Sequence, residues 1–176
     1  MIVCAGKNET IPGAVPIGVG LVESAINLTR LCLMQAPEFI LFAGTAGSYG
    51  EHDVFDIIES RGAAQIELAF WQGKSYTPID NVITSEGLGI EHHTIINSSN
   101  YITTDPGFSK HFVRHRIGAE NMEFFSILSV AKEFNIPAGG IFVITNRCDT
   151  NAHRDYITNY PKALEILQQH LKERFV

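Results

Sequence analysis

The fold class is decided by the stretch Phe39-Ile40-Leu41-Phe42-Ala43-Gly44-Thr45-Ala46-Gly47, which Glu38 precedes. Its first half is a continuous apolar run, and glycines then recur through Gly50. Such a run is typical of a parallel strand that is buried on both faces before a glycine-rich turn. We therefore predict a strand over Glu38–Ala43 and a turn over Gly44–Gly50. This turn could present backbone N–H groups to an anion, or it could be a plain tight turn.

Short apolar runs alternate with longer amphipathic stretches on both sides of this segment, which predicts an α/β sandwich. Apolar residues at helical spacing predict helices over Leu21–Met34, Asn121–Phe134 and Pro161–Arg174. The polar segment between Trp71 and Glu91 is expected to run over the surface at one end of the sheet. Further strands are predicted over Ile2–Ala5, Val15–Val19, Val54–Ile58, Ala63–Phe70, Val82–Thr84, Thr94–Ile96 and Gly140–Thr145.

Length and charge narrow the class of protein. With 176 residues we expect a single domain that spans residues 1–176. The 13 basic and 19 acidic side chains give a net charge of −6 without a basic run, which argues against nucleic-acid binding. No apolar run approaches the ~20 residues of a membrane span, and the amino terminus does not resemble a signal peptide. We therefore expect a soluble, cytoplasmic protein without membrane partners.

The cysteines and histidines do not form a recognisable metal or nucleophile motif. Cys4, Cys32 and Cys148 are odd in number and far apart, which favours free thiols in a reducing compartment. Of the seven histidines, His111 and His115 could share a helix face, but a third ligand is not evident. We expect surface or core histidines, His153 among them, and no metal site.

Two polar side chains stand where predicted elements meet. Glu123 opens a predicted helix, where a carboxylate can favour the helix dipole by about 0.3–1 kcal/mol. It could instead grip the paired hydroxyls of a sugar. Asn146 follows the predicted strand Gly140–Thr145, at the end where α/β folds collect ligands. Its amide offers a donor and an acceptor to a purine edge, although asparagine is also an ordinary turn residue.

Three groups of segments, in order, resemble the nucleoside phosphorylase / methylthioadenosine–adenosylhomocysteine nucleosidase family. The resemblance covers about two thirds of the chain, is poor over residues 61–95 and is shortened at the amino-terminal part. It implies a phosphorylase/hydrolase-like fold, a three-layer αβα sandwich with a central mixed sheet. The segments are Pro16–Ala25; Phe39–Gly47 with Asp53–Ile58; and Asn121-Met122-Glu123 with Asn135–Pro137 and Ile141–Asn146.

The resemblance also implies roles for particular residues. Met122 and Glu123 would contact ribose, and Thr45 in the Gly44 segment would hold phosphate or the nucleophilic water. Tyr101 would stack on the base, and Glu9 would activate water. Phosphate is a candidate co-substrate, no other cofactor is implied, and a homo-oligomer is expected.

Two departures from the family pattern bear on the chemistry. Phe42 stands where hexameric phosphorylases have an arginine for phosphate, and Asn146 stands where aminopurine enzymes have an aspartate that protonates N7. An amide cannot donate that proton, but it can hydrogen-bond the N7/O6 edge of a 6-oxopurine.

The sequence therefore predicts an enzyme that cleaves the N-glycosidic bond of purine nucleosides. It would act as a glycosyltransferase by phosphorolysis or as a hydrolase, with 6-oxopurines as the favoured bases. The alternative is a catalytically silent nucleoside-binding protein on the same fold. A flavodoxin-like FMN domain ranks behind both.

Overall fold

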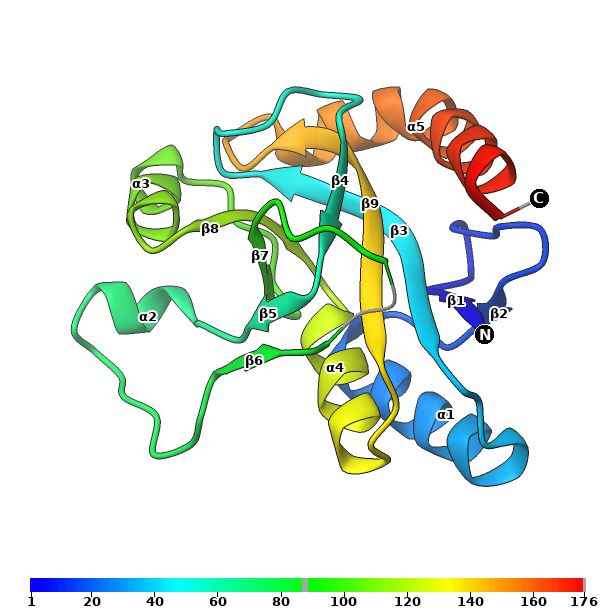
Figure 1. Cartoon of the computed structure of the whole chain (residues 1–176). Helices are drawn as coiled ribbons and strands as arrows, with labels where there is room; N and C mark the ends of the chain where they lie inside the picture. The colour runs from blue at the N-terminus through cyan, green and yellow to red at the C-terminus, as the bar shows by residue number, and fades with distance from the viewer. Residues whose placement is uncertain (87–88, 176) are drawn as a thin grey trace.

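The computed structural model describes residues 1–86 and 89–175, whose strands hydrogen-bond into one mixed sheet (Figure 1). The strand order is β2-β1-β3-β8-β7-β5-β6, and β9 pairs with both β3 and β4. The strands are β1 (Ile2–Cys4), β2 (Val15–Pro16), β3 (Ile40–Ser48), β4 (Ile57–Ser60), β5 (Gly62–Ala64), β6 (Val82–Thr84), β7 (Ile95–Ser98), β8 (Ile117–Asn121) and β9 (Ala138–Arg147). The helices are α1 (Gly20–Gln35), α2 (Leu68–Trp71), α3 (Pro106–Arg114), α4 (Phe124–Glu133) and α5 (Ala152–Phe175).

The centre of the sheet is the parallel pair of β3 and β9. Successive side chains of a strand point to opposite faces, so each face of β3 packs in a different core. Phe42 packs in the cluster that contains Leu28 of α1 and Ile127 of α4. Leu41 packs in the cluster that contains Leu167 of α5. Both faces of this strand are buried, as the continuous apolar run predicts.

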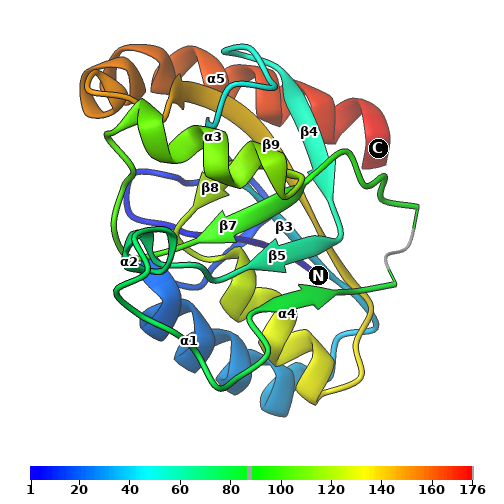
Figure 2. The ribbon, with the colours of Figure 1, turned by 90° about the vertical axis from the view of Figure 1, so that its left-hand side faces the viewer.

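Helices cover both faces of the sheet, and this confirms the predicted three-layer αβα sandwich. Figure 2 shows α5 above the central strands and α1 with α4 below them. The α3 helix packs through Phe112 with Tyr49 and Ile117 in a third apolar cluster. Among the described residues, no helix is both long and apolar enough to cross a membrane. The three cysteines are buried and free.

The predicted turn over Gly44–Gly50 is wrong, because β3 continues through this segment to Ser48. Gly44 lies opposite Phe142 of β9, and Gly47 lies opposite Asn146 after a register shift. The reason for glycine is space rather than turn geometry. A Cβ on Gly44 would lie 2.7 Å from the Phe42 ring, and one on Gly47 would lie 3.0 Å from the Asn146 amide nitrogen.

Other predicted boundaries also move. The strand predicted over Ala63–Phe70 is instead β5 and α2, because the Ile66 N–H leaves the sheet to donate to the Asn97 side chain. The helix predicted from Asn121 begins at Phe124, because Asn121 still pairs with Ser98 in the sheet. The strand predicted over Val54–Ile58 lies at β4, two residues beyond the turn at Phe55.

Two elements, β8 and α3, were not predicted, and the last helix starts nine residues earlier than expected, at Ala152 rather than Pro161. Its first turns carry mostly polar residues, so apolar periodicity does not reveal them, and Pro161 lies inside it. The strand predicted over Val82–Thr84 coincides with β6. The surface segment predicted between Trp71 and Glu91 contains residues 87 and 88, which lie outside the described residues.

Candidate active site

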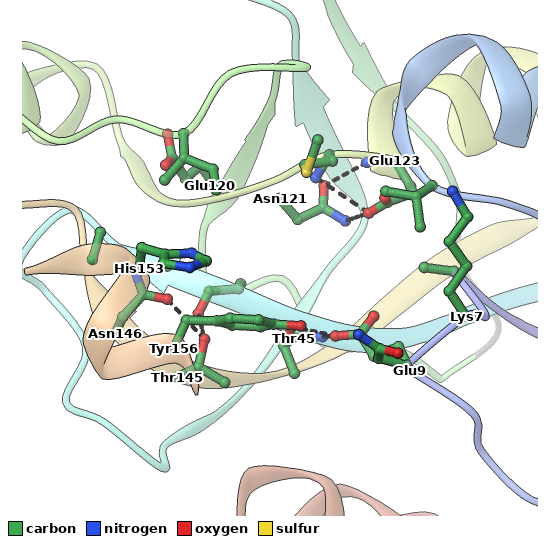
Figure 3. A pocket seen from close by; sticks show the side chains of 18 of the residues that line it. Lys7, Glu9, Thr45, Glu120, Asn121, Glu123, Thr145, Asn146, His153 and Tyr156 are labelled. Carbon is green, nitrogen blue, oxygen red and sulfur yellow. Dashed lines mark hydrogen bonds between the residues drawn. The ribbon is translucent and has the colours of Figure 1, made fainter. Parts of the chain in front are cut away.

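A cavity of about 330 Å³ opens at the carboxyl ends of β3 and β9 (Figure 3). Ligands of open α/β sheets bind outside the carboxyl ends of the strands. Seven separate parts of the chain meet there. The lining comprises residues 5–9 after β1, Val19, residues 45–47 of β3, Tyr101, Ile102, residues 120–123 between β8 and α4, Thr145 and Asn146 of β9, and Ala152, His153 and Tyr156 of α5.

Glu123 is a buried carboxylate that does not cap α4, the helix that it precedes, but is held by three donors. Its side chain is 5% exposed, and it lies immediately before α4. Oε1 accepts a hydrogen bond from the backbone N–H of Gly20 at 2.9 Å. Oε2 accepts from the Asn121 side-chain amide at 3.0 Å and from the Met122 N–H at 3.2 Å. These fixed donors aim the carboxylate into the cavity.

Asn121 supports this arrangement from the end of β8. Its Oδ1 accepts hydrogen bonds from the Ser98 hydroxyl at 3.0 Å and from the Phe124 N–H at 3.0 Å. The side-chain oxygen of Asn121 therefore accepts from the first N–H of α4, and its nitrogen donates to the Glu123 carboxylate. A single amide therefore links the sheet, the helix α4 and the Glu123 carboxylate.

Glu9 is the second buried carboxylate, and it reaches the cavity from a tight turn after β1. Gly6 and Glu9 bridge across this turn, in which Gly6 and Lys7 both have positive φ. Glu9 Oε1 accepts from the Thr45 N–H at 3.1 Å and from the Thr45 hydroxyl. A Cβ on Gly44 would lie 3.2 Å from the other oxygen, Oε2, so Gly44 leaves room for this carboxylate.

Burial disfavours the charged form of both carboxylates. It raises the pKa of Glu123 to about 7, against hydrogen bonds from Gly20 and Met122 that lower it, and the negative charge of Glu9 adds to the rise. Burial also raises the pKa of Glu9, against the hydrogen bonds from Thr45. Two carboxyl groups with raised pKa values in one cavity are a common sign of acid–base chemistry.

The raised pKa of Glu123 predicts a pH-dependent stability. Because the folded state binds this proton more tightly than the unfolded state, the free energy of unfolding should fall as pH rises from about 4.5 through 7. The shift corresponds to about 3 kcal/mol. Urea unfolding between pH 4.5 and 8 measures it. The Glu123→Gln variant cannot titrate there and is expected to give a flatter profile; equal slopes in the two proteins would contradict this assignment.

Asn146, the second-last residue of β9, lies at the opposite end of the cavity. Its Oδ1 accepts from the Thr145 hydroxyl at 2.8 Å, and its Nδ2 donates to the Arg147 carbonyl at 3.1 Å. One amide hydrogen and one oxygen lone pair remain for a ligand. Figure 3 shows Asn146 and His153 on one side of the cavity, across from Glu9 and Glu123.

The structure brings most of the predicted site residues to this one cavity. Glu9, Thr45, Met122, Glu123 and Asn146 all line it. Tyr101 also lines it, and its side chain is 77% exposed. Gly44, which is also predicted to contact substrate, is not among the described lining residues, and a Cβ on it would lie 3.2 Å from Glu9 Oε2. The roles assigned to these residues remain predictions.

Four further lining residues with functional side chains were not singled out from the sequence. They are Lys7, Glu120, His153 and Tyr156. The early start of α5 places the last two at the cavity, whereas the helix predicted from Pro161 leaves both outside it. Glu120 stands three residues before Glu123, and this proximity in the sequence is the feature that could have indicated it. Lys7 lies in the turn that Gly6 and Glu9 bridge, directly after β1, and the pairing of β1 with β3 places this turn at the cavity.

The comparisons with known proteins bear on the fold. No protein-family profile and no curated protein sequence matches this chain. A solved structure of Helicobacter pylori 5′-methylthioadenosine/S-adenosylhomocysteine nucleosidase with a bound inhibitor matches with a TM-score of 0.80 and 18% identity, over 98% of this chain and 95% of that one. Futalosine hydrolase of the same organism, in mutant form, matches with a TM-score of 0.80 and 18% identity, over 97% and 95%.

The nucleosidase of Streptococcus pneumoniae, with a transition-state inhibitor, matches with a TM-score of 0.77 and 16% identity, over 97% of this chain and 95% of that one. At such identities the likeness is one of fold. This chain has the fold of nucleosidases, as the three sequence segments indicate.

Proposed function

We propose that this chain cleaves the N-glycosidic bond of purine nucleosides, with water as the nucleophile. The observation that carries the proposal is the pair of buried carboxylates, Glu9 and Glu123, across one cavity from the amide of Asn146. The fold shared with 5′-methylthioadenosine/S-adenosylhomocysteine nucleosidases and futalosine hydrolase supports it.

Glu123 is suited to bind ribose. Oε1 has one acceptor site beyond the bond from Gly20, and on Oε2, which accepts from Asn121 and Met122, a ligand hydroxyl would replace the longer bond from Met122. Two neighbouring hydroxyls of a sugar could donate to these sites, and hydrogen bonds to a charged acceptor are the stronger kind. Because this carboxylate is already held by three donors, the sugar would be bound in one orientation, which is what a reacting C1′ requires.

Glu9 is suited to activate a water molecule. Its Oε1 is occupied by Thr45, which leaves Oε2 as the oxygen that would accept a proton from water. Burial raises the pKa of Glu9, and a base whose pKa is closer to the working pH accepts a proton more readily. Thr45 thus acts by orienting the carboxylate.

The same contacts favour hydrolysis over phosphorolysis. The two donors of Thr45 that phosphate would use are directed to Glu9, so an anion there would meet a negative charge. Phe42 is fully buried against the rings of Phe124 and Phe142 and offers no charge. Among the described lining residues, the one Lys or Arg is Lys7, whose exposed ammonium lies 3.7 Å from Glu23.

Asn146 supports the proposed preference for 6-oxopurines. Thr145 fixes the amide oxygen, and the free hydrogen on Nδ2 would donate to the O6 or N7 acceptor of the base. A 6-amino group presents a donor in place of O6 and would match this amide hydrogen less well. Tyr101 and Ile102, both exposed at the cavity, would cover the face of the base.

Chromatographic detection of free base tests the function. Inosine, guanosine, adenosine and methylthioadenosine are each incubated with the protein, with and without phosphate. We expect base and a free sugar from inosine and guanosine without phosphate. Release that requires phosphate would replace hydrolysis by phosphorolysis. Thermal stabilisation by a nucleoside without any product would instead support the catalytically silent binding protein. Asn146 favours that alternative, because its uncharged amide cannot donate a proton to the leaving base.

A cytoplasmic homo-oligomer is part of the same proposal. The outer face of α1 exposes Val22, Ile26 and Leu33, each more than half exposed. Contiguous exposed apolar side chains often mark an association surface, and a second copy of the chain would cover them.

A further inference from the structure

The proposed hydrolysis leaves one chemical requirement without a residue. When the bond between C1′ and a purine nitrogen breaks, the electron pair stays on the base, which becomes a good leaving group once a proton neutralises it. Asn146 is placed at the base end of the cavity, but an amide has no acidic proton to give. A second group must therefore act as the general acid.

Most titratable groups of the cavity are already committed. Glu120 Oε2 accepts from the hydroxyls of Tyr49 at 2.7 Å and Thr103 at 2.6 Å, and its Oε1 accepts from the Thr103 N–H at 2.9 Å. These three donors occupy both oxygens of its carboxyl group. Glu9 and Glu123 lie on the other side of the cavity from Asn146.

Tyr156 and Lys7 are poor acids in these positions. Burial raises the pKa of Tyr156, and the charges of Glu9 and Glu123 raise it further, so this phenol holds its proton tightly. Lys7 lies beside Glu9 and Glu123 in Figure 3, on the far side of the cavity from Asn146. Neither side chain combines the right place with a proton that is easily released.

His153 has both properties. It is the second residue of α5, it lines the cavity, and Figure 3 shows its ring on the same side of the cavity as Asn146. Its side chain is exposed, and its ring makes no hydrogen bond to the described residues. Imidazole exchanges protons near neutral pH, and solvent contact allows it to be reprotonated after each turnover.

The start of α5 brings this ring to the base. The helix follows β9 after a short turn, in which the Asp149 side chain accepts from the Asn151 N–H at 2.7 Å and the Ala152 N–H donates to the Asp149 carbonyl at 3.0 Å. Asn146 and His153 are therefore seven residues apart but project from either side of one turn.

We propose that His153 is the general acid that protonates the departing purine, because the amide of Asn146 cannot supply that proton. This inference rests on the proposed function. In the reaction, the C1′–N9 bond breaks and its electron pair passes into the purine ring. The imidazolium of His153 transfers a proton to N7, while Asn146 hydrogen-bonds the same edge. Water forms the new bond to C1′ and gives its proton to Glu9. The proton that Glu9 gains and the one that His153 loses are exchanged with solvent, so nucleoside and water yield base and sugar.

The test compares inosine with 7-methylinosine, whose base is already positively charged and leaves without a proton. We expect His153→Gln to lower kcat/KM for inosine by about 100-fold or more, the usual effect of a general acid, and to change that for 7-methylinosine by less than about threefold. Arg154→Gln, at the neighbouring exposed position of the same helix, is the matched control and should leave both rates unchanged. His153→Ala should reproduce the His153→Gln result.

Each other outcome overturns the proposal. Equal slowing of both substrates by His153→Gln would assign His153 to substrate positioning, and an unchanged inosine rate would remove it from the reaction; the proposed function would survive either result. If the wild-type protein cleaves neither substrate, the proposed function fails and His153 fails with it. Should it cleave inosine alone, 4-nitrophenyl riboside replaces 7-methylinosine, because its phenolate also leaves without a proton.

Discussion

Glu9→Gln is expected to abolish most of the base release while nucleoside binding persists. The substitution keeps the shape of the side chain and an acceptor for the Thr45 donors, but removes the group that takes a proton from water. Loss of a general base typically lowers kcat by about 10²–10⁴-fold. Initial rates with inosine measure the loss in kcat, and titration calorimetry measures the dissociation constant, which should change far less.

Thr45→Val is the matched control for this prediction. It removes the hydroxyl that donates to Glu9 but retains the carboxylate and the backbone N–H. We expect a smaller loss of kcat than in Glu9→Gln, because the base is present but less well oriented. A Glu9→Gln protein with undiminished kcat would show that another group activates the nucleophile.

The second large effect is expected from Glu123→Gln, which should weaken ribose binding and slow cleavage together. A hydrogen bond to a charged group contributes about 1.5–3 kcal/mol. Because two hydroxyl contacts would lose the charge, kcat/KM is expected to fall by about 100-fold or more. One of the three donors that hold the carboxylate would also face the amide nitrogen of glutamine and lose its acceptor. Steady-state kinetics with inosine measures this effect, and a melting temperature near that of the wild type shows that the variant is folded.

A substrate without the 2′ and 3′ hydroxyls of ribose provides the control for Glu123. The wild-type protein should cleave 2′,3′-dideoxyinosine far more slowly than inosine, whereas Glu123→Gln should discriminate little between the two. This non-additivity is expected only if the carboxylate and the hydroxyls interact directly. Undiminished discrimination in the variant would place the ribose elsewhere.

The central strands could be predicted from the sequence because their signal is local. The run from Phe39 to Ala43 is apolar at every position, which is typical of a strand buried on both faces, and Ile40 to Ala43 are buried in β3, whereas Phe39 lies exposed just before it. The glycines that follow were misinterpreted as a turn. Glycine permits both a turn and a close approach of side chains, and only the neighbouring Phe42 and Asn146 show that space is the reason here.

The candidate site divides in the same way. Glu123 and Asn146 could be selected because each stands next to a strong local pattern, a helix start and a buried strand end. His153 and Tyr156 could not, because the polar first turns of α5 carry no apolar period. Their place at the cavity follows from the packing of α5 against the sheet, which depends on Ala163, Leu167 and Leu171 further along the helix.

By itself, the sequence determined the α/β class and the central strand, and it predicted Glu123 and Asn146 as site residues from their places beside local patterns. Those inferences depend on side-chain type and on spacing over a few residues, whereas Glu9 was predicted from the family resemblance alone. Only the tertiary structure decided that Glu9 accepts from both donors of Thr45, that burial raises the pKa of Glu123, and that His153 lines the same cavity as Asn146. Such properties arise from burial and from contacts between residues that are far apart along the chain, and short-range patterns do not contain them.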